Sequence, residues 1–147
     1  MSTTLTEAQA RRMLEEERVA RLATSDAEGR PHLVPVVFAL AGDRIFLPID
    51  HKPKRSASPE KLRRVRNLRA NPRASLLVDR YDEDWARLAW VRVDGPAALV
   101  AEGPEYREAV TRLTEKYPQY RAHPLPAEGA SLVIVLHIDA LRGWSAS

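Results

Sequence analysis

The spacing of hydrophobic residues changes several times along the chain, which predicts a mixture of helices and strands. Apolar residues recur at helical spacing up to about residue 17, and Thr4 with Glu7, or Thr6 with Gln9, has the spacing of a capping box. β-branched and alternating runs follow, separated by short polar turns. They predict strands over residues 18–24, 31–40, 44–49, 74–81, 88–100 and 131–138, with 141–144 ending the chain.

Two further helices are predicted between these strands. Ser58 can cap a helix that has Pro59 at its first position and ends before the Asn-Pro pair at 71–72. Residues 103–116 show the pattern of an amphipathic helix, and the proline-containing stretch 117–129 is expected to be an ordered cover or loop.

This order of elements favours one mainly β (α+β) domain over residues 1–147. About six antiparallel strands in so short a chain favour closure into a barrel, because closure removes unpaired strand edges. Pro35 lies inside the second predicted strand and lacks a backbone donor, so it predicts an edge strand or a bulge there.

Composition narrows the class of protein. Of the 147 residues, 44% are hydrophobic, which is enough for a core, and none is cysteine, which excludes disulfides and thiolate chemistry. No apolar run approaches the roughly 18–20 residues of a membrane span, and the polar N-terminus lacks a signal-peptide core. We therefore expect a cytoplasmic protein with no membrane partner.

Positive charge is concentrated in one segment. The net charge is only +3, but residues 52–73 contain nine Lys or Arg residues and a single acid. Such a cluster attracts anions, and nucleic acid, a phosphorylated cofactor or an acidic tail would all qualify. On one continuous helix, Lys61 and Arg64 would share a face and Arg63 and Arg66 another.

The start of this helix adds to the cluster. The free backbone N–H groups of this helix near Ser58 would bind anions, and three cations precede the helix in the chain. These cations are Lys52, Lys54 and Arg55.

Other catalytic signatures are missing from the sequence. Glycines do not cluster into a phosphate-binding loop, and the four histidines lack metal-ligand spacing, so we predict no metal site and no catalytic side chain. An enzyme of this kind would depend on a bound cofactor.

Four segments together resemble the pyridoxamine 5'-phosphate oxidase-like FMN-binding split-barrel superfamily, and the resemblance spans nearly the whole chain. They are the hairpin segments ARLATS (20–25) and RPHLVPVVF (30–38), the basic RVRNL (64–68) with its following Asn-Pro-Arg, and VRVDGPA (91–97). The resemblance implies a six-stranded antiparallel split β-barrel with flanking helices. It also implies a homodimer whose subunits both contribute to each cofactor pocket.

The resemblance assigns roles to individual residues. It implies that Arg63 and Arg64, with Lys61 before them, contact the cofactor phosphate. Pro35, Val36 and Val37 are expected to lie against the cofactor ring system. Trp85 is a candidate for the pocket wall or the dimer interface.

The sequence departs from pyridoxamine 5'-phosphate oxidases proper on the second strand. Those enzymes carry an Arg and a Lys where residues 34–39 are apolar here, which argues against pyridoxamine phosphate oxidation. Residues 50–55 and 81–85 are similar to the branch of PPOX-class probable F420-dependent oxidoreductases.

We therefore expect an enzyme that transfers hydride between the deazaflavin coenzyme F420 and a small organic acceptor. F420 is more anionic than FMN, and an extended strip of cations suits its acidic tail. An FMN-binding flavoprotein and a cofactor carrier without turnover stay open. A nucleic-acid binder is the least supported, because acids elsewhere nearly balance the charge and no recognised reading helix occurs.

Overall fold

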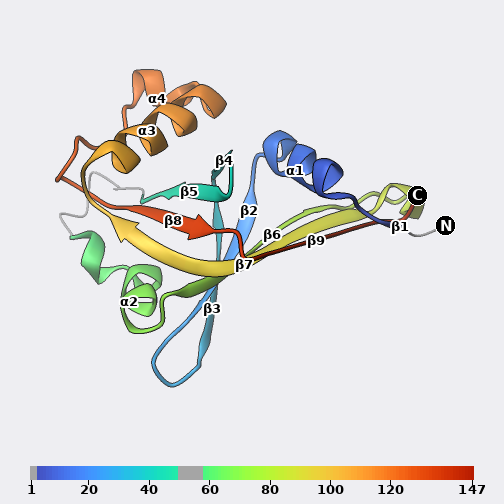
Figure 1. The fold of residues 1–147 in the computed structure, drawn as a ribbon, viewed down its shortest axis with the longest axis horizontal. Helices are drawn as coiled ribbons and strands as arrows, with labels where there is room; N and C mark the ends of the chain where they lie inside the picture. Colours follow the sequence, from blue (N-terminus) through green and yellow to red (C-terminus); the bar gives the residue numbers. More distant parts are fainter. Residues whose placement is uncertain (1–2, 50–57) are drawn as a thin grey trace.

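The computed structural model describes residues 3–49 and 58–147, and in them a curled antiparallel sheet of nine strands is flanked by four α-helices (Figure 1). The strand order is β3-β2-β6-β7-β8-β5-β4, with β9 paired to β7 and β1. The strands are β1 (Thr3–Thr4), β2 (Ala20–Ser25), β3 (Pro31–Val36), β4 (Ala39–Ala41), β5 (Arg44–Pro48), β6 (Arg73–Arg80), β7 (Ala89–Val100), β8 (Val133–His137) and β9 (Ala140–Ser145). The helices are α1 (Glu7–Glu16), α2 (Arg63–Ala70), α3 (Pro104–Lys116) and α4 (Gln119–Ala122), with 3-10 turns at Pro59–Lys61 and Trp85–Arg87.

The α+β class and the curled antiparallel sheet confirm the prediction, but the expected number of strands is wrong. The run predicted over 31–40 divides into β3 and β4, and the ends of the chain add β1 and β9. The division occurs at Phe38, whose backbone N–H donates to the hydroxyl of Tyr117 at 3.1 Å, while that hydroxyl lies 3.0 Å from the Phe38 carbonyl oxygen. A side chain of α3's C-cap therefore bonds the backbone there in place of a neighbouring strand.

Strand β7 joins the two parts of the sheet. Its first half lies between β6 and β9, and its last four residues pair with β8. The change of partner occurs at Gly95, where an added Cβ would lie 1.8 Å from the carbonyl oxygen of His137. Only glycine allows the two backbones to approach so closely, so this residue fixes where the sheet curls.

The sheet separates two hydrophobic cores. Strands β5 and β8 are buried on both faces: Ile45 and Ile134 contribute to the core beneath α1 and α2, whereas Phe46 and Val135 contribute to the core beneath α3. This burial on both faces explains why the apolar runs of these strands are nearly continuous.

One of the two capping boxes predicted for the first helix is present at the start of α1. Thr6 is the N-cap, and its side chain and that of Gln9 bond each other's backbone N–H. None of the described helices is long and apolar enough to cross a membrane.

Candidate functional site

The hairpin formed by β2 and β3 is fixed to α2 by two side-chain hydrogen bonds. Asn67 Nδ2 donates to Thr24 Oγ1 at 3.0 Å, and these side chains belong to residues that are 4% and 5% exposed. One turn further along, Asn71 Nδ2 donates to Ser25 Oγ at 2.8 Å. Because buried polar groups need partners, these bonds set the distance between the hairpin and the basic helix.

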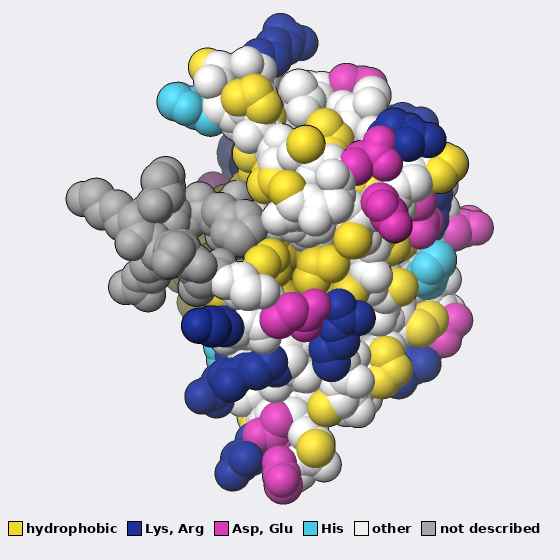
Figure 2. All heavy atoms as spheres, turned by 90° about the vertical axis from the view of Figure 1, so that its left-hand side faces the viewer, with side chains coloured by type: hydrophobic (Ala, Val, Ile, Leu, Met, Phe, Trp, Pro, Cys, Tyr) yellow, Lys and Arg dark blue, Asp and Glu magenta, His cyan; other side chains and the backbone are white. Residues whose placement is uncertain are grey.

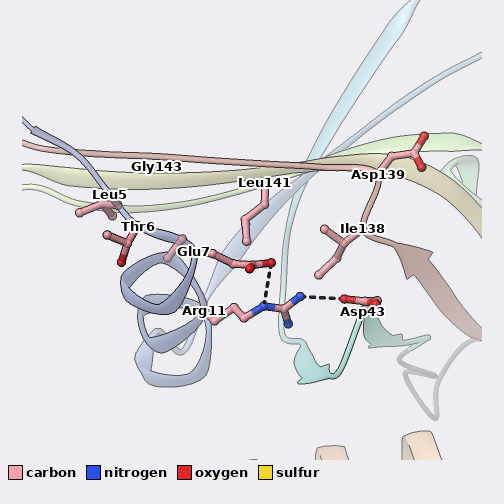
Figure 3. A pocket seen from close by; sticks show the side chains of 10 residues that line it. Leu5, Thr6, Glu7, Arg11, Asp43, Ile138, Asp139, Leu141 and Gly143 are labelled. Carbon is pink, nitrogen blue, oxygen red and sulfur yellow. Dashed lines mark hydrogen bonds and ion pairs between the residues drawn. The ribbon is translucent and has the colours of Figure 1, made fainter.

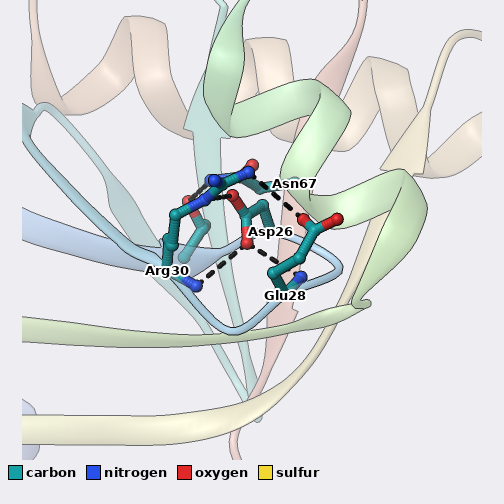
Figure 4. A network of polar contacts seen from close by, with 5 residues as sticks. Asp26, Glu28, Arg30 and Asn67 are labelled. Atoms are coloured by element: carbon teal, nitrogen blue, oxygen red, sulfur yellow. Dashed lines mark hydrogen bonds and ion pairs between the residues drawn. The ribbon is translucent and has the colours of Figure 1, made fainter.

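The turn of the hairpin is held by its own charged side chains (Figure 4). The carboxylate of Asp26 accepts hydrogen bonds from the backbone N–H groups of Glu28 and Arg30, both at 2.9 Å, and from Arg30 Nε at 2.7 Å. The hydrogen bond from the Arg30 side chain lowers the pKa of Asp26 below 3.8. The carboxylate therefore stays ionised, and this part of β3 keeps a defined position beside α2.

This arrangement brings His32 of β3 close to the positive charges of Arg63 and Arg64 of α2. Burial lowers the pKa of His32 below 6.5, and the charges of Arg63 and Arg64 lower it further. Its Nδ1 atom is buried and has no hydrogen-bond partner among the residues that the structure describes. We call these three residues the α2–β3 site.

The chemistry of the α2–β3 site fits a phosphate group. Two guanidinium groups can bind phosphate oxygens through charge-assisted hydrogen bonds, and an imidazole can add a donor when it is protonated. Figure 2 shows Lys and Arg side chains gathered on the lower part of the face where α2 lies in Figure 1.

Strand β3 forms one edge of the described sheet, as Pro35 predicted. Alternation along the strand puts His32, Val34 and Val36 toward one face, and Leu33 and Pro35 toward the other. Pro35 and Val36 therefore cannot both face one ring on the same side of β3, and Val37 follows the strand. The three residues predicted to contact the ring lie around an edge rather than on one surface.

The predicted helix from Ser58 is interrupted, which corrects two expectations. Leu62 has an extended backbone (φ −70°, ψ 137°) and packs against the core, so a three-residue 3-10 turn precedes α2. Lys61 and Arg64 therefore do not share one helical face. The turn is also too short to provide a helix dipole, and the Ser58 side chain already accepts a bond from Glu60 N.

Trp85 lies far from the α2–β3 site within one chain. Strand β6 leads away from α2 for eight residues, or about 26 Å (Figure 1). The turn Trp85–Arg87 follows beside the C-terminus, where Ser147 Oγ donates to the carbonyl oxygen of Ala86 at 2.7 Å. The Trp85 side chain is exposed, as is that of the neighbouring Tyr81. The remaining predicted cofactor residues, Lys52, Lys54 and Arg55, lie outside the described residues.

Two of the grooves on the described surface lie beside the β2–β3 hairpin and beside α1. One, of about 380 Å³, lies at the ends of β2 and β6 on the face of Pro31 and is lined by polar groups that include Arg73 and Asp94. The other, of about 340 Å³, lies between α1 and β9, where Arg11 pairs with Glu7 at 3.6 Å and with Asp43 at 2.8 Å (Figure 3). The third carboxylate of this groove, that of Asp139, pairs with Arg73 outside it at 3.4 Å.

Among residues 3–49 and 58–147, no group of three His, Asp or Glu side chains could hold a metal ion. Sequence reasoning treated His32 as an ordinary histidine and did not single out Asn67. A signal was available for Asn67, because it stands between Arg66 and Leu68 on the buried side of a helix where a polar residue needs a partner.

The family model for pyridoxamine 5'-phosphate oxidase matches residues 6–145. Similar solved structures include an FAD-binding protein from Mesorhizobium loti, with 21% identity over 100% of this chain and 99% of that one and a TM-score of 0.74. A conserved hypothetical protein from Mycobacterium tuberculosis has 23% identity over 97% and 86% of the two chains and a TM-score of 0.75. The heme storage protein HutZ from Vibrio cholerae has 19% identity over 92% of each chain and a TM-score of 0.70.

At these identities the solved structures establish the fold. No curated protein matches the sequence.

Proposed function

Because the chain belongs to the pyridoxamine 5'-phosphate oxidase family, we propose that it binds a flavin-type cofactor at the α2–β3 site and acts as an oxidoreductase. The observation that carries this proposal is the pair Arg63 and Arg64 beside a neutral, half-buried His32. Solved proteins with the same fold bind flavin or heme, which agrees with a cofactor-binding role.

We further propose that the cofactor is F420, with FMN as the alternative. The inner face of β3 carries Val34 and Val36 and no cation that could recognise a second phosphate. Positive charge instead extends from the turn before α2 into its first turn, at Lys61, Arg63 and Arg64. A line of cations suits a phosphodiester with an acidic tail better than one compact phosphate.

A bound deazaflavin would supply hydride-transfer chemistry, and the side chains described here would bind and orient it. Arg63 and Arg64 would hold the phosphate, while the apolar side chains of β3 would exclude water from their side of the pocket. No described residue is assigned as an acid or base.

We also propose that the protein works as a homodimer. The outer face of β3 and β6 exposes apolar side chains: Leu33 is 66% exposed and Leu77 36%, and Val19, just before β2, is 45% exposed. Strand register puts Leu33 and Leu77 in adjacent rows, on either side of β2. A second copy packed on this face would bury these residues. Trp85 could then reach the α2–β3 site only from the partner subunit.

The phosphate assignment is tested by measuring F420 affinity in Arg64→Ala. Loss of a hydrogen bond to a charged group should weaken binding by about 1.5–3 kcal/mol. Arg66→Ala is the matched control, since it removes the same charge from the same helix but Arg66 is not among the cations that lower the pKa of His32. Equal losses of F420 affinity in both variants would mean that the overall positive charge matters and not a specific contact of Arg64. Unchanged affinity in Arg64→Ala would refute the assignment.

The dimer is tested by Leu33→Glu with Leu77→Glu, followed by sedimentation and F420 titration. We expect a folded monomer with weak binding, because a charge in each of two apolar positions opposes association. A folded monomer that binds F420 like the wild type would contradict a pocket built by two subunits.

Heme is the second candidate ligand, on the evidence of the fold shared with HutZ. A neutral imidazole could bind the heme iron, and His32 has the lowered pKa that favours this form. A Soret band that appears on titration with hemin and is lost in His32→Ala would favour heme.

A carrier without turnover would bind reduced F420 but would not oxidise it with any acceptor.

A further inference from the structure

The side chain of Lys116 is half-buried at the junction of α1, α3 and the chain between β3 and β4. Its Nζ donates to the carbonyl oxygen of Leu14 at 3.1 Å and lies 3.7 Å from the centre of the Phe38 ring. Phe38 itself is fully buried. The amine therefore lies against an apolar ring and one carbonyl group rather than in open solvent.

Within the described part of the chain, no carboxylate lies within 4.0 Å of this amine. The cation that acts on this amine is Arg18, which stacks 4.6 Å above Tyr117 and donates to the Lys116 carbonyl oxygen at 2.6 Å. Glu15 and Glu17 act on the amine from longer range and oppose this repulsion. Burial is the dominant effect, because a partly buried amine without a carboxylate partner is disfavoured as a cation relative to its neutral form.

Burial, followed by the charge of Arg18, lowers the pKa of Lys116 from 10.5 to about 8. At pH 7.5 about a quarter of such an amine is unprotonated, against about one in a thousand for a lysine with the usual pKa. A groove of about 300 Å³ adjoins Lys116. It is lined by Glu15, Ala39, Leu40, Arg112, Glu115 and Lys116, so small molecules can reach the side chain.

We propose that Lys116 is a modification site, which small activated acyl donors such as acyl phosphates and acyl thioesters acylate in preference to the other lysines. The free amine attacks the carbonyl carbon of the donor and forms a C–N bond. The C–O or C–S bond to the leaving group breaks, phosphate or thiol departs, and the amine proton passes to solvent. The product is an uncharged amide, so the modification removes the cation that lies over Phe38.

The reaction is tested with acetyl phosphate on the full-length folded protein at pH 7.5, with acetylation of each lysine followed by peptide mass spectrometry. Lys61 is the internal reference, because it is exposed on the 3-10 turn before α2. The larger unprotonated fraction is partly offset by the lower nucleophilicity of a weaker base, so we expect Lys116 to react about tenfold faster than Lys61. Unfolding in urea should abolish this preference.

The pH profile distinguishes a reactive amine from an accessible one. We expect the Lys116 rate to rise with pH and to level off by about pH 9, where most of an amine with a pKa of about 8 is unprotonated. A Lys116 rate equal to or below that of Lys61 at pH 7.5, or one that still rises above pH 9, would overturn the proposal.

Discussion

The hydroxyl of Tyr117 holds the junction between β3 and β4, and its removal in Tyr117→Phe should destabilise the fold. The hydroxyl accepts a hydrogen bond from Phe38 N at 3.1 Å, and the carbonyl oxygens of Arg18 and Phe38 lie 2.9 and 3.0 Å from it. Its single proton can fully satisfy only one of these carbonyl groups at a time. The substitution therefore removes one donor bond and leaves the buried N–H of Phe38 without its partner.

The expected cost follows from these two losses. A buried donor left without a partner costs about 1–3 kcal/mol, and loss of the hydroxyl's own donor bond adds to it, so we expect about 2–4 kcal/mol in total. Chemical denaturation with urea measures this as a lower midpoint at unchanged m-value. The melting temperature should fall by about 5–12 °C for a chain of this size.

Tyr81→Phe is the matched control for this experiment. Tyr81 is 67% exposed, and its hydroxyl has only long contacts, 3.4 Å to Trp85 Nε1 and 3.5 Å to Glu83. Its loss should cost less than about 0.5 kcal/mol. If Tyr117→Phe is as stable as this control, the hydroxyl does not hold the break between the strands.

Further predictions concern the sheet and the α2–β3 site. Gly95→Ala should destabilise by more than about 3 kcal/mol or prevent folding, because its Cβ would overlap the carbonyl of His137 at 1.8 Å; circular dichroism during thermal unfolding measures this. Asn67→Ala should cost about 2 kcal/mol in urea unfolding by removing the buried bond to Thr24, and should also weaken F420 binding as α2 loosens. A bound phosphate should raise the lowered pKa of His32, so binding takes up a proton and F420 affinity should rise as the pH falls from about 7.5 to 5.5; titrations across this range should show a flatter profile in His32→Gln. Because the pKa of His32 is lowered, the folded free protein binds fewer protons at this residue than the unfolded chain. The contribution of His32 to the free energy of unfolding therefore decreases as the pH falls below 6.5.

Local signals in the sequence predicted much of the fold. The capping box at Thr6 and Gln9, the edge strand at Pro35 and the end of α2 before Pro72 each depend on residues close together in the chain. Such features follow from local hydrogen bonding and from the missing donor of proline. Together with the periodicity of apolar residues, these local signals were sufficient to place most strands and helices.

The remaining features depend on contacts between distant parts of the chain. The strand break at Phe38 needs the hydroxyl of Tyr117, 79 residues away, and the extended backbone of Leu62 accompanies its packing against the core. The two residues of β1 are too few to show a period. Neither propensity nor periodicity contains this information.

The candidate site was predicted only in part for the same reason. Arg63 and Arg64 were predicted from the family resemblance within the cluster of positive charge, but His32 joins them only because the β2–β3 hairpin packs against α2. Trp85 was grouped with these cations although β6 separates it from them within one chain. Charge density along the sequence identified the basic segment, and tertiary packing determined its neighbours.

The most direct test of the proposed function is an equilibrium titration of the purified wild-type protein with F420 and, separately, with FMN, followed by fluorescence at two salt concentrations. We expect micromolar or tighter F420 binding, weak FMN binding, and an F420 affinity that falls at the higher salt because the contacts are ionic. A preference for FMN would contradict the deazaflavin assignment, and binding of neither cofactor would contradict the proposal that the α2–β3 site holds a flavin-type cofactor.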